Sequence, residues 1–446
     1  MTTTNKTPRF PKGYSIFQVL LKTNDFLKHP IHFIQKSMDK FGDSYGVTLP
    51  DGRKIIWTKN PEFVDYVLRV NQRNFIKSAF STGRAADFFG NGLVFSTGEY
   101  WRRQRRLIQP GFHRQKLLGL YGIIIKTIEE FLAEIPTDQA IDVYPIVNHL
   151  SFTVLINSLF DISLSKELLT ELNQLFNEIQ AFIMDEANKP YKKLFYPITG
   201  VEKKQYAKSK RLRAILLDII KERKSSSNTY TDILDMLLHS TYEDTGEVMT
   251  EEQMIDELLI LLFAGFETSS NVMSWLLYLL AINKTSKEKL VQSLKGTDTY
   301  ESVQNEYLKA TINEGLRLYP AAWMTERMSV KADTFEGIAI PKDTHIMPFF
   351  YGVHRNKKYW NNPDNFQPER FIKDGSLLKS KAFFPFGVGP RMCIGNHFAL
   401  AEISFFIHAF FEKFDIEATD QVPKMNPLLT LQPDKIMVKI KSRFGG

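Results

Sequence analysis

The chain has 446 residues, 43% of them hydrophobic, and its 57 basic and 50 acidic residues give a net charge of +7. This charge suits an acidic protein partner, an anionic membrane surface or a plain basic surface bias, and gives little support to nucleic-acid binding. Cys393 is the only cysteine, which excludes an intramolecular disulfide and a cysteine-rich zinc site and favours a reducing, cytoplasmic compartment.

The N-terminal segment predicts no membrane span. Its apolar stretch, Tyr14–Leu21, is interrupted by Gln18 and followed by Lys22, whereas a spanning helix needs about 20 apolar residues. No small-residue cleavage site follows it. We expect a soluble monomer whose tail, about residues 1–10, is disordered.

Hydrophobic periodicity favours a mainly helical chain with a smaller β-rich part. A β-hairpin is expected over Ser44–Thr58, where two alternating runs flank Pro50-Asp51-Gly52. Asn60–Val70 follows as a helix with a proline in its first turn. We find no internal repeat, no low-complexity linker and no domain boundary, so residues 1–446 are predicted to form a single domain.

Further along the chain, three segments predict loops: Asp87–Thr97, Tyr191–Gly200 and Ser225–Asn228. Trp101–Leu120 predicts a helix. Asp333–Arg355 contains β-like runs separated by turns, which predicts short strands.

The longest predicted helix is Thr250–Asn283. Thr250 and Gln253 form a capping box at its start, and at ~1.5 Å per residue it would be about 50 Å long. It is apolar nearly all round from Leu258 to Phe266, so we expect it to be buried. The polar residues that follow argue against a membrane span, and polar side chains in a buried helix need an explanation.

Cys393 lies in the stretch Phe383–Ala399, where three interpretations compete. A lone cysteine is usually a small buried hydrophobe. It is a candidate nucleophile with His397 as base, although no nucleophile signature surrounds it. It also suits an iron-bound thiolate, because a helix expected to open at the cysteine would stabilise the negative charge, and Gly387 and Gly389 allow close approach of backbone N–H groups.

The segment Phe386–Gly395, "FGVGPRMCIG", resembles the haem-binding signature of cytochromes P450. Its fixed positions match here at Phe386, Gly389, Arg391, Cys393 and Gly395. The resemblance implies the cytochrome P450 fold, Cys393 as the axial ligand of the haem iron, and Arg391 as a partner of a haem propionate. Phe386 and Gly395 are implied as further cofactor-binding residues.

Two other segments extend the resemblance to a structural triad. Thr311–Pro320 resembles the Glu-x-x-Arg element of the family, and Asn362–Phe371 resembles its Pro-Glu-Arg-Phe segment. The resemblance implies that Glu314, Arg317 and Arg370 form a buried triad under the haem. Taken alone, Glu314 and Arg317 are three residues apart and fit a common surface ion pair equally well.

Ala264–Ser270, "AGFETSS", resembles the oxygen-binding turn of the family. The hydroxyl of Thr268 can bond the carbonyl of Ala264 and bend the helix. Gly265 is expected to leave room for dioxygen, and Glu267 and Thr268 are implied as the catalytic pair that passes protons. The alternative is a plain kink in a long helix.

Glu99–His113 and Met324–Met328 resemble the segments that contact haem propionates. Trp101, Arg105 and Arg327 are the implied contacts. Arg102 and Arg106 form a second stripe on the helix, and we expect Arg103 to point outward. The outer arginines are implied as a docking site for an acidic electron donor; a solvated face or a phosphate-binding patch is the alternative.

The resemblance implies a haem-thiolate monooxygenase that contains haem b (iron protoporphyrin IX) and uses O2 for hydroxylation or oxidative O-dealkylation. One cysteine cannot hold an iron–sulfur cluster, so electrons from NAD(P)H would arrive through a separate ferredoxin or flavodoxin and its reductase. A small apolar substrate is expected: a fatty acid, terpenoid, carotenoid, steroid or methoxy compound. The candidate pocket residues are Phe88, Phe89, Val94, Phe263, Ala264, Ala322, Trp323, Leu429 and Leu431.

Three other functions stay open at this point. A haem-thiolate isomerase or peroxygenase would not need the pair Glu267 and Thr268. A haem sensor or carrier would need no electron donor. A cysteine hydrolase is the third alternative.

Overall fold

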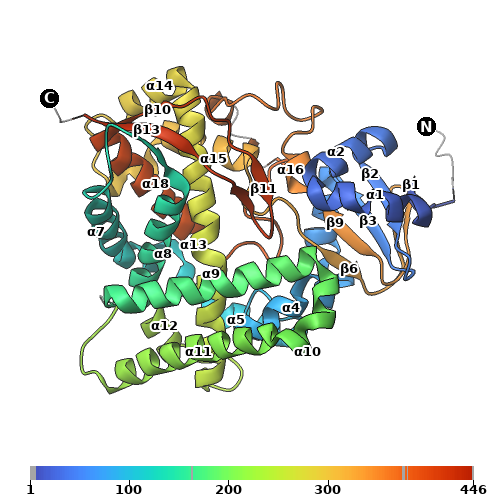
Figure 1. Cartoon of the computed structure of the whole chain (residues 1–446), viewed down its shortest axis with the longest axis horizontal. Coiled ribbons are helices and arrows are strands. Elements are labelled where there is room, and N and C mark those ends of the chain that lie inside the picture. Colours follow the sequence, from blue (N-terminus) through green and yellow to red (C-terminus); the bar gives the residue numbers. More distant parts are fainter. Residues whose placement is uncertain (1–6, 162–163, 374–376, 379, 444–446) are drawn as a thin grey trace. The chain divides into compact units, whose positions relative to one another are not determined.

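The computed structural model describes residues 7–161, 164–373, 377–378 and 380–443 (Figure 1). Most of the predicted disordered tail, residues 1–6, lies outside these ranges. The chain divides into two compact units. Residues 1–81 and 316–393 form the β-rich unit, and residues 82–315 and 394–446 form the helical unit. That the whole chain acts as a single domain stays a prediction.

The β-rich unit is built on a six-stranded sheet with the order β1-β2-β3-β9-β6-β4. The predicted hairpin is confirmed, since β2 and β3 are antiparallel and Gly46 lies opposite Ile56. The predicted short strands after residue 333 are also confirmed, and α16 follows them. The strands are β1 (Gly13–Tyr14), β2 (Ser44–Thr48), β3 (Lys54–Thr58), β4 (Phe75–Ile76), β6 (Arg327–Ser329), β7 (Asp333–Phe335), β8 (Ile338–Ile340) and β9 (His345–Pro348).

The helices of the β-rich unit begin with α1 (Ile16–Lys28) and α2 (Pro30–Phe41). The predicted helix over Asn60–Val70 is confirmed: the side chain of Asn60 caps α3 (Pro61–Asp65), and Tyr66–Val70 continues as a π-helical turn. The unit also contains the short helices α16 (Phe350–Val353) and α17 (Arg370–Lys373).

The helical unit holds the longer helices and two small sheets. The helices that lie wholly in it are α5 (Gly98–Ile108), α6 (Arg114–Leu117), α7 (Tyr121–Leu132), α8 (Val143–Phe160), α9 (Lys166–Asn188), α10 (Tyr196–Thr199), α11 (Val201–Ser225), α12 (Ile233–His239), α13 (Glu251–Ile282), α14 (Lys284–Leu294) and α18 (Asn396–Lys413). Helices α4 (Ala79–Phe89) and α15 (Glu306–Leu318) cross the boundary between the units along the chain. The strands are β5 (Ala140–Asp142), β10 (Phe414–Ala418), β11 (Met425–Pro427), β12 (Leu431–Pro433) and β13 (Met437–Ser442).

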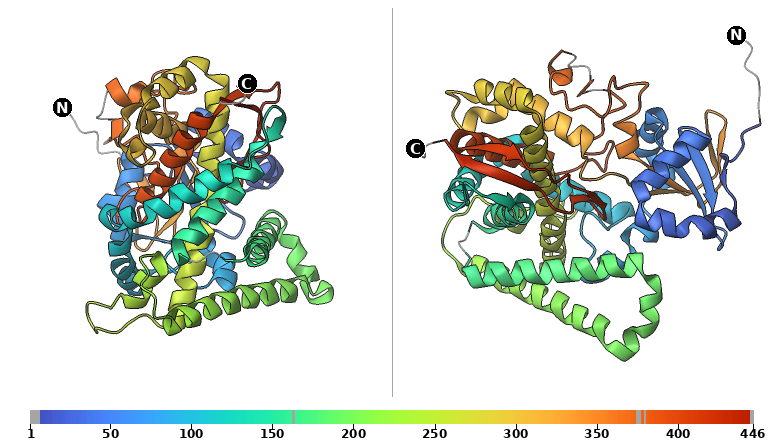
Figure 2. Two further views of the ribbon diagram at one scale, coloured as in Figure 1. Left: turned by 90° about the vertical axis from the view of Figure 1, so that its left-hand side faces the viewer. Right: turned by 45° about the horizontal axis from the view of Figure 1, so that its top comes forward.

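Helix α13 agrees with the prediction almost to the residue. Thr250 is its N-cap and forms the predicted capping box with Gln253. Figure 2 shows α13 running through the helical unit, with α8 and α18 packed against it. Both α13 and α8 are long and apolar enough to span a membrane. However, 78% of the most apolar stretch of α13 and 61% of that of α8 are buried inside the structure. They therefore form the core of this unit.

Three predicted segments differ from the structure. Asp87–Thr97 was expected to be a loop, but α4 extends to Phe89 because Phe88 and Phe89 are buried. Tyr191–Gly200 was also expected to be a loop, but it is mostly 3-10 helix and α10. The predicted helix over Trp101–Leu120 breaks after Ile108, where Pro110 has no amide hydrogen for a helical bond.

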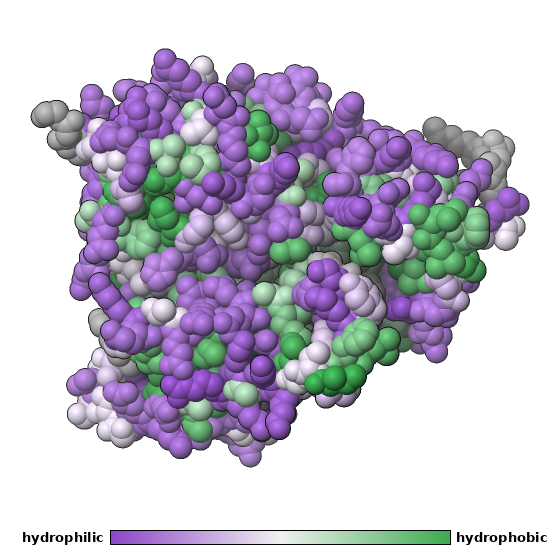
Figure 3. All heavy atoms as spheres, in the orientation of Figure 1, coloured by the Kyte–Doolittle hydropathy of each residue, from purple (hydrophilic) through white to green (hydrophobic). Residues whose placement is uncertain are grey.

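Two surfaces of the molecule expose apolar side chains. Figure 3 shows such side chains gathered near α10, where Ile198 of α10 and Leu194 and Phe195 of the preceding 3-10 helix are largely exposed. In the β-rich unit, α1 has no buried residue, and its Phe17 and Leu21 are exposed. The apolar stretch Tyr14–Leu21 is therefore the end of β1 and the first half of an exposed amphipathic helix.

Candidate functional site

The polar turn of α13 places Thr268 and Glu267 side by side. The hydroxyl of Thr268 donates to the carbonyl oxygens of Ala264, at 2.9 Å, and Gly265, at 3.2 Å. The first of these is the bond expected from the sequence. The hydroxyl proton is therefore used within the helix. The oxygen of Thr268 can still accept a hydrogen bond from another group.

Glu267 is held by a residue that the sequence did not reveal. Its carboxylate accepts a hydrogen bond from the hydroxyl of Thr430, which lies in the turn between β11 and β12. Thr430 in turn accepts a bond of 2.9 Å from the amide of Asn271. All three side chains are buried, so this chain of hydrogen bonds fixes the acid in one orientation.

Gly265 does not face open space, contrary to the expectation. A Cβ atom at this position would lie 2.6 Å from Cδ2 of Leu155, which belongs to α8. The missing side chain therefore allows α8 to pack closely against α13. The expectation that Gly265 leaves room for dioxygen is wrong.

A second buried carboxyl, Glu402 on α18, lies in the same unit. Burial raises the pKa of Glu402 to about 7, although the hydroxyl of Ser151 donates to its carboxyl group at 2.7 Å. Its ordinary pKa is 4.5, so between about pH 4.5 and 7 the folded protein keeps a proton that the unfolded chain releases.

The contribution of Glu402 to the stability of the protein should therefore fall as pH rises through this window and become level above it. Glu402→Gln removes the titrating group. The slope of the unfolding free energy against pH should therefore become less steep by up to ~1.4 kcal/mol for each pH unit. Urea denaturation at pH 5, 6 and 7 measures the effect. Glu412→Gln, at an exposed position of the same helix, is the control. Equal slopes for Glu402→Gln and the unaltered protein would contradict the assignment.

The cysteine loop belongs to the β-rich unit and exposes its thiol. The backbone N–H of Cys393 donates to the carbonyl of Phe386 at 2.9 Å, which closes the loop. Gly389 has a φ of +79°, and a side chain there would overlap the backbone carbonyl of Leu68. Only glycine fits this position.

The helix after the cysteine begins later than expected. Gly395 is the N-cap of α18, and the first helical residue is Asn396. The prediction that the helix opens at Cys393 is wrong by three residues, and the amide of Cys393 is bonded across the loop to Phe386. Phe386 itself is half-buried.

Positive charge gathers in the β-rich unit around Arg327. Burial lowers the pKa of Lys77 to about 7, and the nearby charges of Arg327 and Arg391 lower it further. Burial also lowers the pKa of Arg327 to about 10. The sequence pointed to Arg327 and Arg391 but missed Lys77, a single lysine in an apolar run. The carboxylate of Glu326 raises the pKa of both Lys77 and Arg327 and so offsets part of this charge. The remaining positive charge suits a ligand with two carboxylates, as haem has.

Helix α5 carries the remaining predicted haem contacts. Trp101 and Arg105 are one turn apart and half-buried, and Arg105 donates to Gln109 at 3.1 Å. Arg102 and Arg106 are exposed, as expected. Arg103 also reaches the surface, as expected: its side chain is 40% exposed, pairs with Asp244 at 3.1 Å and lies 4.6 Å from the ring centre of Tyr242.

Two of the three predicted triad residues are fully buried. Glu314 and Arg317 on α15 have no exposed surface, which excludes a surface ion pair. The guanidinium of Arg317 donates to the carbonyls of His354 at 2.9 Å, Pro363 at 2.6 Å and Asn365 at 3.2 Å. Arg370 is half-exposed and shares the Asn365 carbonyl at 3.4 Å. It therefore lies at the edge of this network.

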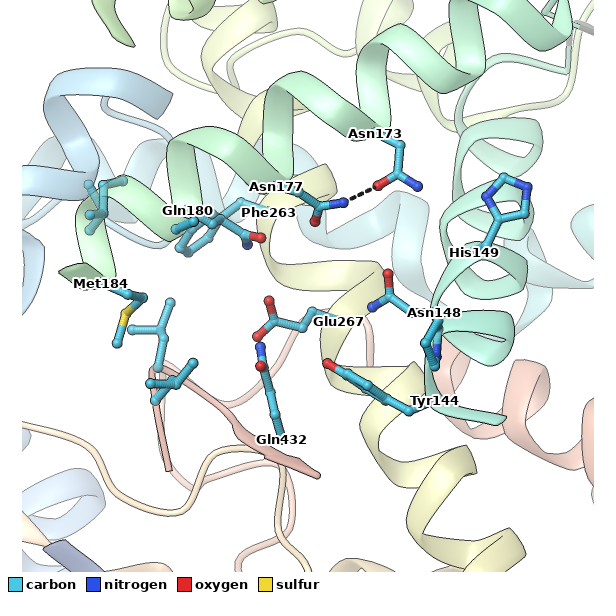
Figure 4. Close-up of a pocket in the computed structure, with 16 residues that line it drawn as sticks. Tyr144, Asn148, His149, Asn173, Asn177, Gln180, Met184, Phe263, Glu267 and Gln432 are labelled. Carbon is cyan, nitrogen blue, oxygen red and sulfur yellow. Dashed lines mark hydrogen bonds between the residues drawn. The ribbon is translucent and has the colours of Figure 1, made fainter. Parts of the chain in front are cut away.

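The helical unit also contains a cavity of about 480 Å³ (Figure 4). Its walls come from α4, α8, α9, α13, β12 and the turn between β11 and β12. Of the nine predicted pocket residues, Phe263 and Leu429 line it, and Glu267 faces it. Many polar side chains line it as well, whereas an aromatic, apolar pocket was expected.

The other predicted pocket residues lie elsewhere. Phe88 and Phe89 are core residues, and the ring of Phe89 packs 5.2 Å from Phe176 and 4.8 Å from Phe263. Leu431 is fully buried and accepts a bond from Trp275 through its carbonyl. The remaining four do not line this cavity: Val94 and Ala264 are half-buried, Ala322 is exposed, and Trp323 packs on Phe349 in the β-rich unit.

Among the described residues, no group of three or more His, Cys, Asp or Glu side chains could hold a metal ion. The exposed thiol of Cys393, the only cysteine of the chain, is a soft ligand that suits haem iron. The cysteine loop, which requires glycine at position 389, and the basic cluster around Arg327 also fit haem.

Comparisons with known proteins agree on one family. The family model described as Cytochrome P450 matches residues 8–440. Cyclooctat-9-en-7-ol 5-monooxygenase of Streptomyces melanosporofaciens is 28% identical over 394 residues, covering 85% of this chain and 83% of the relative. Lithocholate 6-beta-hydroxylase of Mesocricetus auratus is 28% identical over 467 residues, covering 97% and 91%.

A solved structure, the haem domain of cytochrome P450DA, aligns with a TM-score of 0.86 at 20% identity and covers 98% of each chain. This likeness confirms the predicted mainly helical fold with a smaller β-rich part.

Proposed function

Since the chain belongs to the cytochrome P450 family and is an oxidoreductase of the monooxygenase type, we propose that it inserts one atom of O2 into an organic substrate by hydroxylation or oxidative O-dealkylation. The observation that supports the proposal most directly is the exposed thiol of Cys393. The loop that presents it can form only with glycine at position 389.

In this proposal Cys393 binds the iron of haem b (iron protoporphyrin IX), and Phe386 and Gly395 flank the ligand loop. In the β-rich unit, Arg327, Arg391 and Lys77 would offset the charge of the propionates. On α5, Arg105 is proposed as a further cationic contact and Trp101 as a hydrogen-bond donor through its indole N–H. Bound haem would supply the activation of O2 and the transfer of one oxygen atom. The chain supplies the ligand, the charge and the protons.

Glu267 and Thr268 are the proposed catalytic pair. Glu267 takes up a proton from the cavity that it faces, and Thr268, its neighbour on the helix, relays the proton through its hydroxyl. Thr430 is a positioning residue, because its hydroxyl holds the carboxylate of Glu267.

Thr430→Val should release the carboxylate of Glu267 and slow turnover by roughly tenfold, the worth of one hydrogen bond to a charged group. Oxygen consumption driven by a reduced electron donor measures the rate. Thr430→Ser keeps the hydroxyl and, as the matched control, should keep the rate of the unaltered protein. An unchanged rate in Thr430→Val, or an equal loss in Thr430→Ser, would contradict the positioning role.

Electrons would come from NAD(P)H through a separate ferredoxin or flavodoxin and its reductase. The exposed Arg102 and Arg106 are the proposed docking charges. The rate of reduction should fall steeply as salt rises above about 0.1 M, where charges are screened over ~10 Å. Arg102→Glu with Arg106→Glu should lower the rate further at low salt. A rate independent of salt would contradict this docking site.

The substrate is the open part of the proposal. The names of two relatives give cyclooctat-9-en-7-ol and lithocholate as the molecules they oxidise, which supports an alicyclic substrate of terpenoid or steroid type. Spectral titration of the haem with a compound library identifies ligands. The product of the best ligand, formed under ¹⁸O2 with an electron donor, should carry one labelled oxygen.

Labelled oxygen from water, or turnover without an electron donor, would contradict the proposal and favour a peroxygenase or isomerase. Ligand binding without any oxygen consumption would favour a haem sensor. The cytoplasmic location and the monomeric state stay predictions.

A further inference from the structure

The cavity of the helical unit is lined in part by neutral amide side chains. Five carboxamides from α8, α9 and β12 face it: Asn148, Asn173, Asn177, Gln180 and Gln432. A carboxamide offers two donors and one acceptor and carries no charge. Figure 4 shows the amides of α9 on one side of the space and Glu267, Gln432 and Tyr144 on the other.

The spacing along α9 explains how these amides share one face. Asn173, Asn177 and Gln180 are four and three residues apart, which places them one turn above another on the helix. Asn177 donates to Asn173 at 2.8 Å, so the two form a connected pair. The side-chain amides of Gln180 and Gln432 make no hydrogen bond to another described residue. They are available to a ligand.

The charge of the cavity excludes most ionic ligands. Among the described residues that line it there is no lysine or arginine, so a carboxylate or phosphate would find no counter-charge. Its one carboxylate, Glu267, is already bonded to Thr430, and Tyr144 and His149 are the other titratable groups. Neutral hydrogen-bonding groups suit this wall best.

The rest of the lining is apolar. Phe263, Met184, Ile183, Leu428 and Leu429 provide hydrocarbon surface beside the amides. A volume of about 480 Å³ is in the range of small-molecule sites. The lining therefore combines an apolar part with a neutral polar part.

We propose that this cavity binds a neutral amphiphile: a molecule with an apolar body and several hydroxyl groups, such as a glycoside or polyol of a lipid or terpene. The inference rests on the proposed function in that the bound molecule would be the substrate of the monooxygenase. It changes the expected substrate from a purely apolar molecule to one recognised through its hydroxyl groups. A site that hydrogen-bonds hydroxyl groups discriminates strongly against analogues that lack them.

The test uses two ligands with the same eight-carbon tail. Octyl β-D-glucoside, kept below its micelle concentration, has a neutral polyol head, and octanoate has an anionic one. Calorimetric titration of the haem-loaded protein should show that the glucoside binds at least about tenfold more tightly, the worth of one or two hydrogen bonds. Equal affinities, tighter binding of octanoate, or no saturable binding of the glucoside would overturn the proposal.

Matched variants locate the binding site. Gln180→Leu should weaken glucoside binding by roughly tenfold and leave octanoate unchanged. Gln174→Leu changes the same residue type on the exposed face of α9 and should have no effect. Gln432→Leu, on the opposite wall, tests the same claim if Gln180→Leu fails to fold. Full glucoside affinity in either folded cavity variant would overturn the proposal.

A ferrous–CO spectrum of the same samples separates this proposal from the proposed function. Selective glucoside binding without a thiolate-type spectrum would leave the cavity assignment intact and contradict the monooxygenase proposal. A thiolate-type spectrum without glucoside selectivity would support the monooxygenase proposal and contradict the cavity assignment.

Discussion

Replacing Cys393 by alanine is expected to abolish the red-shifted Soret band of the reduced, CO-treated, haem-loaded protein. That band requires a thiolate on the haem iron, and Cys393 is the only cysteine of the chain, so no other thiolate can take its place. The variant should stay folded, because Cys393 is exposed and its hydrogen bond to Phe386 comes from the backbone, which alanine keeps.

The control for this variant is the neighbouring residue. Met392 is 39% exposed, and Met392→Ala should keep the red-shifted band. Circular dichroism of both variants checks that the fold is retained, and the haem content is measured separately. A red-shifted band that survives in Cys393→Ala would show that the thiolate of Cys393 is not the iron ligand, and the proposed function would then fail.

Features that depend on neighbours in the sequence were predictable. The capping box of Thr250 and Gln253 and the bond from Thr268 to Ala264 each join residues three or four positions apart, where helix geometry alone fixes the distance. The hairpin over Ser44–Thr58 follows from its turn and its alternation in the same way. A single sequence contains all the information these features need.

Features that depend on distant neighbours were not predictable. Thr430 is 163 residues from the carboxylate that it holds, and Lys77 is far along the chain from Arg327 and Arg391. Gly265 was assigned to the wrong neighbour for the same reason, since its contact with Leu155 arises only when α8 packs on α13. Nothing in the local pattern of any of these residues records its partner.

The family resemblance predicted only a few of the residues that line the cavity. The resemblance pointed to Phe88 and Phe89, but burial among other rings makes them core residues. The amides of α9 are polar positions on an amphipathic helix, which in sequence are typical of a solvated face. Only the folded structure shows that three of them face a cavity.

Replacing Arg317 by alanine is expected to cost about 3–5 kcal/mol of folding free energy, the range for breaking a buried charged network. The side chain is fully buried and donates to three backbone carbonyls, those of His354, Pro363 and Asn365. Alanine would leave these acceptors without a donor that reaches them, and would also leave a cavity beside the ring of Trp360, which lies 5.1 Å from the guanidinium carbon.

Two further variants show which property of Arg317 matters. Arg317→Lys keeps the positive charge but lacks the planar fork that reaches several acceptors, so it should recover only part of the loss. Arg370→Ala removes a half-exposed side chain that donates to the carbonyl of Asn361 and to Gln367, each at 3.0 Å. It should cost about 1–2 kcal/mol, less than Arg317→Ala, because water can replace hydrogen bonds that are partly exposed. Urea denaturation followed by circular dichroism measures all three. Equal losses for Arg317→Ala and Arg370→Ala would contradict the argument, because burial is what makes the first network costly to break.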